Sequence, residues 1–226
     1  MDSPRDLDIR VALRAELRDI HAHEPDTAII DELSLRQGDA RVDLAVVNGS
    51  LSGYEIKSDR DTLTRLPRQL VVYETCFNTM TIVVGSRHVD GCFEGVPETW
   101  GIWEAIPCVA GLKFEVRRYA MINPQIDAKS VVQLLWKDEA LNSLAELGIR
   151  LNANLTRRDL WEHLVASVSA DELFKIVRER LRARGDWRSG PTPFRGGGLS
   201  RSASKSPRYR ENRDWLLSAR SQRLPD

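Results

Sequence analysis

The sequence predicts an α/β fold with the element order αβββαβ, followed by a helical segment and a basic tail. Three observations lead to this fold. An amphipathic helical pattern near the N-terminus precedes three short apolar strands separated by turn signals. A second helical pattern then leads to a fourth apolar strand. With 226 residues, the chain is long enough for one domain with a substantial core.

The first helix is predicted from apolar residues that recur at helical spacing between Ile9 and Ile20. It follows Pro4 and ends before Pro25. Because apolar and charged residues alternate at the helical period, one face of this helix should pack on the sheet.

Three strand candidates follow, at 28–35, 41–47 and 53–58. The dipeptides Gln37-Gly38 and Asn48-Gly49 separate them, and both are turn signals. Short turns of this kind join antiparallel neighbours, so we expect an antiparallel meander.

A second helix is predicted over 61–77, with Pro67 either in its first turns or at a kink. It leads to a fourth strand at 81–85, which is continuously apolar. These two elements complete the αβββαβ order.

The stretch from 86 to 128 is predicted to be irregular. Trp100 and Trp103 are expected to anchor it by packing, and 113–119 has the pattern of a strand. No residues in this stretch suggest chemistry.

Helices are predicted again at 129–147 and 157–184. Thr156 with Asp159, and Ser169 with Glu172, have the spacing of N-terminal capping pairs. The composition then changes to Arg, Ser, Gly and Pro, with nine basic and four acidic residues from 185 to 226, which is typical of a disordered basic tail. The predicted division is therefore a domain at 1–128, a helical segment at 129–184 and a tail at 185–226.

Charge and cysteine content restrict the function class. The 33 basic and 33 acidic residues balance, so any affinity for nucleic acid must be local. Three cysteines without a CxxC motif suggest neither a disulfide framework nor a zinc site, which fits a reducing compartment. No apolar run approaches the length of a membrane span, and the first residues are charged, so we expect a cytoplasmic protein without membrane contact.

The residues that could carry a chemical function are Asp43 in one apolar strand and Glu55 and Lys57 in the next. Carboxylates removed from water without partners cost several kcal/mol, so buried acids usually pair or bind a metal. Because strand residues alternate between faces, Glu55 and Lys57 share one face and Ile56 points to the other.

Whether Asp43 joins them depends on the turn, because opposed residues of an antiparallel hairpin lie on the same face. A two-residue loop at Asn48-Gly49 would set Asp43 opposite Tyr54. A three-residue loop would set it opposite Glu55. We predict the three-residue loop, or a bulge at Gly53 that has the same effect.

The preceding hairpin adds a third acid, since a two- or four-residue loop around Gln37-Gly38 sets Glu32 opposite Asp43. Carboxylates at roughly 5 Å in an effective dielectric near 20 repel by about 3 kcal/mol per pair. A cation would relieve this repulsion, and oxygen ligands favour Mg²⁺ or Mn²⁺. Alternatively, Glu32 pairs with Arg41 or Arg36.

A metal-bound water of lowered pKa is a natural nucleophile at such a site. Lys57 could orient this water or stabilise charge that develops on a phosphate. The chemistry that these residue types favour is hydrolysis of a phosphodiester bond.

At this point the pattern is recognisable. D(43)…E(55)xK(57) on consecutive strands, with a helix before and after, resembles the restriction-endonuclease-like core of the PD-(D/E)XK nuclease superfamily. Gln69 and Tyr73 match the QxxxY motif of its RecB-type branch. The segments IIDEL, ARVDLAVVNG, GYEIKSDRDTLTRLPRQ and VVYETCF more closely resemble a group of small bacterial and phage-associated PD-(D/E)XK-like proteins. The resemblance covers most of 7–105 and, more weakly, the helices after 128.

This resemblance implies a nuclease that acts on nucleic acid, most naturally DNA, with Mg²⁺ or Mn²⁺ as cofactor. Asp43 and Glu55 would ligate the metal together with the backbone carbonyl of Ile56, and Lys57 would be the catalytic base or charge stabiliser. Gln69 and Tyr73 would place the substrate backbone.

Superfamily members frequently place a further acid on the first helix. Here Glu16 and Asp8 are candidates, beside Glu32 on the first strand.

Several alternatives stay open at this stage. Nuclease folds are also reused without catalysis, so the chain could be a silent module that binds nucleic acid or a protein partner. The helices at 129–184 would then contact a partner protein or form the interface of a homodimer. Tyr73 could be a packing residue beside a solvated Gln69, and the arginines of the tail could hold phosphates or stay hydrated.

Overall fold

The computed structural model describes residues 4–152 and 154–184, so the tail expected at 185–226 lies outside the described residues. The described chain has an α/β fold built on one six-stranded sheet with its strands in chain order. The sheet is mixed: β1, β2 and β3 are antiparallel, β3, β4 and β5 are parallel, and β6 is antiparallel to β5. The strands are β1 (Ala28–Leu35), β2 (Ala40–Val47), β3 (Leu51–Lys57), β4 (Thr79–Gly85), β5 (Gly101–Cys108) and β6 (Gly111–Arg118). The predicted αβββαβ order is confirmed, with two further strands after it.

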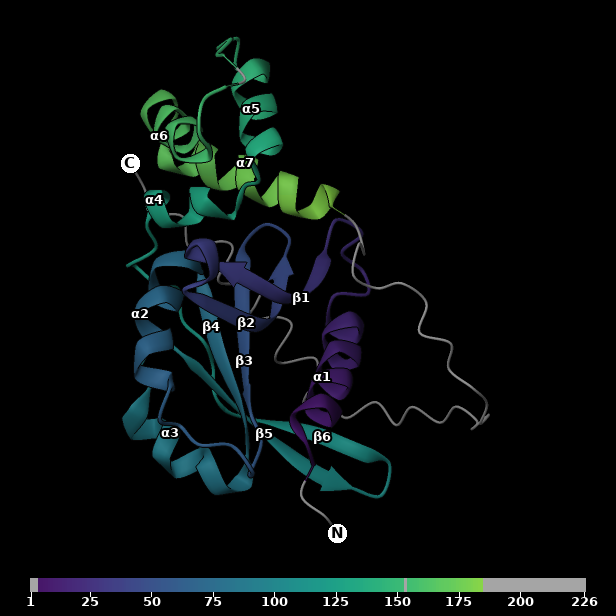
Figure 1. Cartoon of the computed structure of the whole chain (residues 1–226). Helices are drawn as coiled ribbons and strands as arrows, with labels where there is room; N and C mark the ends of the chain where they lie inside the picture. The colour runs from purple at the N-terminus through teal and green to yellow at the C-terminus, as the bar shows by residue number, and fades with distance from the viewer. Residues whose placement is uncertain (1–3, 153, 185–226) are drawn as a thin grey trace, which may run out of the picture. The chain divides into compact units, whose positions relative to one another are not determined.

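Helix α1 (Asp6–Ile20) covers one face of this sheet (Figure 1). Its residues Ile9, Leu13 and Leu17 are buried, as the helical spacing predicted. They form a small core with sheet residues that include Leu44 and Ile56. The face that carries Ile56 is therefore the α1 face.

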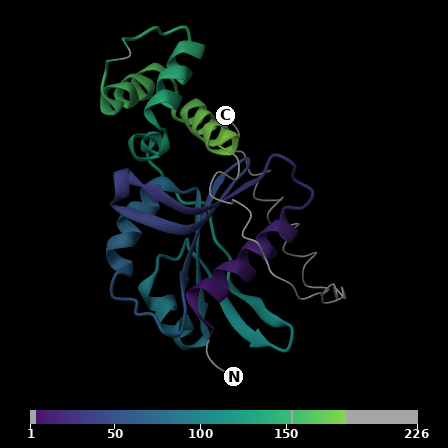
Figure 2. The same ribbon diagram turned by 45° about the vertical axis from the view of Figure 1, so that its right-hand side comes forward.

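Helices α2 (Leu66–Cys76) and α3 (Val89–Gly95) cover the opposite face, and the turned view in Figure 2 shows the sheet between the two helical layers. The prediction that the second helix begins near 61 was wrong. Pro67 lies in the first turn of α2, where its missing N–H would have no intrahelical partner. The residues before it form a turn in which Asp61 accepts hydrogen bonds from the backbone N–H and hydroxyl of Ser58.

The prediction of an irregular stretch from 86 to 128 was also wrong, because α3, β5 and β6 lie there. Two residues make the sequence of β5 unlike that of an apolar strand. Glu104 is buried but ion-paired with Arg117 of β6, and Pro107 lies beyond the part of β5 that pairs with β4. The expected strand near 113–119 is confirmed as β6.

Both tryptophans of this stretch are packing anchors, as expected. Trp100 is buried in the core of the α2 face. Trp103 packs on the α1 face between the rings of Tyr54 and Phe114, with centroids 5.8 and 6.3 Å away.

The C-terminal segment consists of α4 (Ala128–Val131), α5 (Lys137–Glu146), α6 (Arg157–Ser167) and α7 (Ala170–Ala183). The helix expected at 129–147 is interrupted by a 3₁₀ turn, after which Leu135 and Trp136 are extended. Thr156 and Ser169 cap α6 and α7 as predicted. Buried residues of these helices join the core of the α2 face. None of the described helices is both long and apolar enough to cross a membrane.

Candidate functional site

The hairpin of β2 and β3 has the register that brings the predicted acids together. Val47 pairs with Leu51 and Leu44 with Tyr54, across a three-residue loop. Continuing this register by one position sets Asp43 opposite Glu55. The predicted three-residue loop is thus confirmed, and Gly53 pairs regularly with Ala45, so no bulge is needed there.

The hairpin of β1 and β2 sets Glu32 opposite Asp43, because Asp31 pairs with Leu44 and Leu33 with Val42. The backbone is irregular at this position, since Glu32 has a φ of 51°, in the left-handed region that non-glycine residues rarely adopt. Both strands change faces here. Leu33 and Val42 belong to the core on the α2 face, whereas Leu44 belongs to the core on the α1 face.

Asp43 lies where β2 separates from β3. Its carboxylate accepts a hydrogen bond of 2.8 Å from the backbone N–H of Ile56, which follows the last paired position of the two strands. The other oxygen accepts one of 2.6 Å from Arg10. Burial, followed by the charge of Glu55, raises the pKa of Asp43 to about 7, although the Ile56 and Arg10 contacts act in the opposite direction. Asp43 therefore lies close enough to Glu55 to be affected by its charge.

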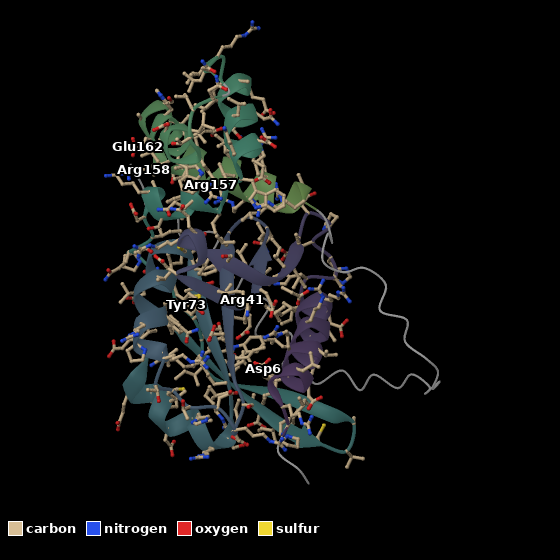
Figure 3. All side chains as sticks on the ribbon, in the orientation of Figure 1. Asp6, Arg41, Tyr73, Arg157, Arg158 and Glu162 are labelled. Atoms are coloured by element: carbon tan, nitrogen blue, oxygen red, sulfur yellow. The ribbon has the colours of Figure 1, made fainter. Side chains whose placement is uncertain are left out.

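Arg10 of α1 connects three acids from three elements. Its guanidinium nitrogens lie 3.0 Å from Asp6 of α1, 2.9 Å from Glu32 of β1 and 2.6 Å from Asp43 of β2. Figure 3 labels Asp6 on α1 and Arg41 on β2, and Arg41 forms a longer ion pair of 3.7 Å with Glu32. Glu32 thus takes part in a charge network with arginines, which includes the Arg41 pairing considered from the sequence.

The sequence reasoning missed Arg10 and Asp6. Their signal is the acid-base spacing i, i+4 on the first helix, beside the buried Ile9. Of the acids on this helix, Asp6 is the one whose charge acts on Asp43. Asp8, one of the expected candidates, instead accepts the backbone N–H of Arg5 at the helix start. Burial raises the pKa of Glu16, the other candidate, which lies two turns further along α1 than Asp8.

Glu55 is almost fully buried, with 2% of its surface exposed, and three side chains surround its carboxylate. The ammonium of Lys57 lies 2.5 Å and the amide nitrogen of Gln69 2.9 Å from one oxygen. The hydroxyl of Tyr73 lies 2.7 Å from the other oxygen. One hydrogen-bonded group therefore contains four of the residues singled out from the sequence: Glu55, Lys57, Gln69 and Tyr73.

Tyr73 both packs in the core and forms hydrogen bonds. Its ring is fully buried against Phe77 and Trp100. Its hydroxyl also lies 3.0 Å from the carbonyl oxygen of Arg41 on β2 and accepts from Gln69 at 3.1 Å. Burial, with the nearby charge of Glu55, raises the pKa of Tyr73, so the hydroxyl keeps its proton for donation.

The registers place Glu32, Asp43 and Glu55 in the predicted row, but their carboxylates do not converge on one point. Among residues 4–152 and 154–184, no three His, Cys, Asp or Glu side chains converge closely enough to hold a metal ion. Glu32 forms ion pairs with Arg10 and Arg41. Asp43 and Glu55 then remain as the neighbouring pair of acids.

The chemistry of the oxygen donors at the site, though not their present arrangement, suits a hard cation. The amide oxygen of Gln69 is buried without a hydrogen-bond partner among the described residues. Its amide nitrogen is fixed by Glu55 and Tyr73, so the two amide atoms cannot exchange places. A buried acceptor without a donor costs about 1–3 kcal/mol. Oxygen atoms of Asp43, Glu55 and Gln69 are the donor type that Mg²⁺ and Mn²⁺ prefer.

Comparison with known proteins identifies the family. A family model described as bacteriophage P4 protein cII matches residues 3–189. Protein cII of Enterobacteria phage P4 is 28% identical over 159 residues, which cover 70% of this chain and 60% of that protein. No solved structure matches the chain. Since the family model covers the whole described region, the chain belongs to the phage P4 cII family.

Proposed function

We propose that this protein is a metal-dependent nuclease of the PD-(D/E)XK type that hydrolyses phosphodiester bonds of nucleic acid, most naturally DNA. The observation that carries the proposal is the register of β2 and β3, which sets Asp43 opposite Glu55 when extended by one position, with Lys57 bonded to Glu55. Gln69 and Tyr73, the two residues of the QxxxY resemblance, hold the same carboxylate from α2.

Asp43, Glu55 and the carbonyl oxygen of Ile56 would hold Mg²⁺ or Mn²⁺. When bound, the ion supplies a water of lowered pKa and neutralises negative charge on the phosphate. Gln69 and Tyr73 fix the orientation of the Glu55 carboxylate, because each donates to a different oxygen. They would also set the position of the substrate backbone beside it.

In this proposal Lys57 is a hydrogen-bond donor that stabilises negative charge. Its ammonium is mostly buried and close to Glu55, so it is held at the site before substrate arrives. The ammonium would donate to the attacking water or to a phosphate oxygen.

A second function is favoured by the charge balance of the site. Arg10 and Lys57 already pair with Asp43 and Glu55, so these acids are compensated without a metal. The chain could therefore be a catalytically silent module that binds nucleic acid or a protein partner, with the helices from 129 to 184 as contact surface.

One assay separates the two functions. Purified protein is incubated with labelled single-stranded DNA, duplex DNA and RNA in Mg²⁺, Mn²⁺ or EDTA, beside the variants Lys57→Ala and Lys113→Ala. Lys113 is the matched control, because it pairs with Glu115 two residues away on β6, as Lys57 pairs with Glu55. Cleavage that needs metal and Lys57, but not Lys113, supports the nuclease. Binding without cleavage supports a silent module that binds nucleic acid. Absence of both contradicts the nuclease and leaves a protein partner as the ligand of the silent module.

A further inference from the structure

Helix α2 runs antiparallel to β3, as contacts at two positions of the strand show. Phe77, just after the helix, lies against Gly53, where an added Cβ would approach its ring to 3.1 Å. Further back in the helix, Tyr73 and Gln69 contact Glu55. The N-terminal turn of α2 therefore lies toward the end of β3 that carries Lys57.

Arg65 immediately precedes α2, one turn before Gln69 and on the same face. Exposure increases along this face, since Tyr73 is buried, Gln69 is half-buried and Arg65 is exposed. Arg65 thus lies on the solvent side of the residues that hold Glu55. A phosphate at the proposed reaction centre would have its neighbouring phosphate within reach of this side chain.

The acids of the connection from β3 to α2 accept hydrogen bonds that fix its backbone. Asp61 accepts the backbone N–H and hydroxyl of Ser58, and Asp59 accepts the backbone N–H of Arg87. These contacts also fix the shape of the connection against the end of β4.

The same connection also carries three arginines. Arg60, Arg65 and Arg68 are all exposed, and none of them forms an ion pair within the described part of the chain. The first turn of α2 contains no acidic residue, and a helix N-terminus adds partial positive charge. The result is a local cationic surface on a chain whose formal net charge is zero.

Some exposed arginines elsewhere in the described chain have acidic partners. Arg158 on α6 pairs with Glu162 one turn away, and both are labelled in Figure 3. Such a pair offers little net charge to a polyanion, whereas three uncompensated arginines within nine residues do.

We propose that Arg60, Arg65 and Arg68 bind the sugar-phosphate backbone of nucleic acid next to the bond to be cleaved. Guanidinium groups match phosphate oxygens in geometry and stay charged. Contacts to phosphates fix the position of the substrate without reading its sequence. This inference rests on the proposed function, because that function places the reacting phosphate beside Lys57 and Gln69.

The test measures binding without cleavage. The affinity of the full chain for a labelled duplex DNA is measured by fluorescence anisotropy in EDTA at several salt concentrations. The variant Arg60→Gln/Arg65→Gln/Arg68→Gln should show a shallower slope of log affinity against log salt, by about 2.7 for three lost phosphate contacts. Circular dichroism and thermal unfolding check that the variant is folded.

A matched variant controls for net charge. Arg150→Gln/Arg158→Gln/Lys175→Gln removes three exposed cations from the C-terminal segment and should leave the slope as in the wild type. Equal slopes and affinities in the two triple variants would overturn the inference, as would a wild type that binds neither duplex nor single-stranded nucleic acid. A wild type that binds through these arginines but cleaves no substrate with any metal would remove only the proposed function.

Discussion

Arg10 donates a hydrogen bond of 2.6 Å to Asp43, so a cation from helix α1 touches the carboxylate that the sequence assigns to a metal. The same guanidinium binds Asp6 and Glu32. If Arg10 released Asp43, it would keep two of its three acidic partners. A divalent cation and this guanidinium would repel each other at one carboxylate, which makes Arg10 a competitor of the metal.

The variant Arg10→Met should therefore bind Mn²⁺ more tightly than the wild type, although it is less stable without metal. Because the ion pair of Arg10 with Asp43 is only partly buried, the loss should be smaller than the cost of about 3–5 kcal/mol that is typical of a buried pair. Thermal unfolding over a Mn²⁺ titration measures both effects, because a ligand of the folded state raises the melting temperature by mass action.

The control for this prediction is Arg14→Met. Arg14 lies one turn further along α1 and pairs with Asp31, so its loss should reduce stability without changing the response to Mn²⁺. An equal response in the two variants would show that Arg10 does not compete with a metal.

The second prediction concerns pH. Burial raises the pKa of Asp43 to about 7, so the folded state binds a proton that the unfolded chain releases between about pH 4 and 7. Stability without metal should therefore fall as pH rises through this window, by a few kcal/mol at most, and level off above about pH 7.

Asp43→Asn should remove this part of the pH dependence. Urea unfolding of wild type and variant in EDTA, at steps from pH 4.5 to 8, gives the difference in slope. Because all other titrating groups are shared, parallel curves would contradict the raised pKa of Asp43.

The third prediction concerns the ligands. Mg²⁺ or Mn²⁺ should raise the melting temperature of the wild type, and Asp43→Asn with Glu55→Gln should abolish this increment. Lys57→Ala should lose cleavage yet keep the increment, since its ammonium is assigned to water and phosphate. A double variant with the full metal response would place the metal elsewhere.

The sequence was sufficient for the part of the fold in which local patterns dominate. The spacing of Ile9, Leu13 and Leu17 predicted α1, and the expectation that Asp43 lies opposite Glu55 predicted the three-residue loop. Both depend on short-range geometry. The strand β5 was missed because Glu104 and Pro107 contradict an apolar strand until Arg117 and the limit of pairing with β4 are known. Those are relationships between elements.

The candidate site shows the same division. Gln69 and Tyr73 were found from their spacing on one helix, but the distribution of charge was not. Repulsion among Glu32, Asp43 and Glu55 was expected to require a metal, whereas Arg10 compensates two of these acids and Lys57 the third. A helix residue reaches a sheet carboxylate only through tertiary packing, which sequence periodicity does not reveal.

The last prediction separates the two residues of the QxxxY pair. Tyr73→Phe keeps the buried ring but leaves one oxygen of Glu55 without its donor, which should cost about 1–3 kcal/mol of stability. Gln69→Ala leaves Lys57 on the other oxygen and removes the unpartnered amide oxygen, so its stability should change less. Both variants should lower turnover, because each removes a group that orients Glu55.

Tyr54→Phe is the matched control. Tyr54 lies on the opposite face of β3, next to Trp103, where burial alone raises the pKa of its hydroxyl. Urea unfolding and single-turnover cleavage of the three variants give stability and rate per folded molecule. We expect Tyr54→Phe to match the wild type in rate. If Tyr73→Phe and Gln69→Ala cleave as fast as Tyr54→Phe, the contacts of α2 with Glu55 serve folding and not the reaction.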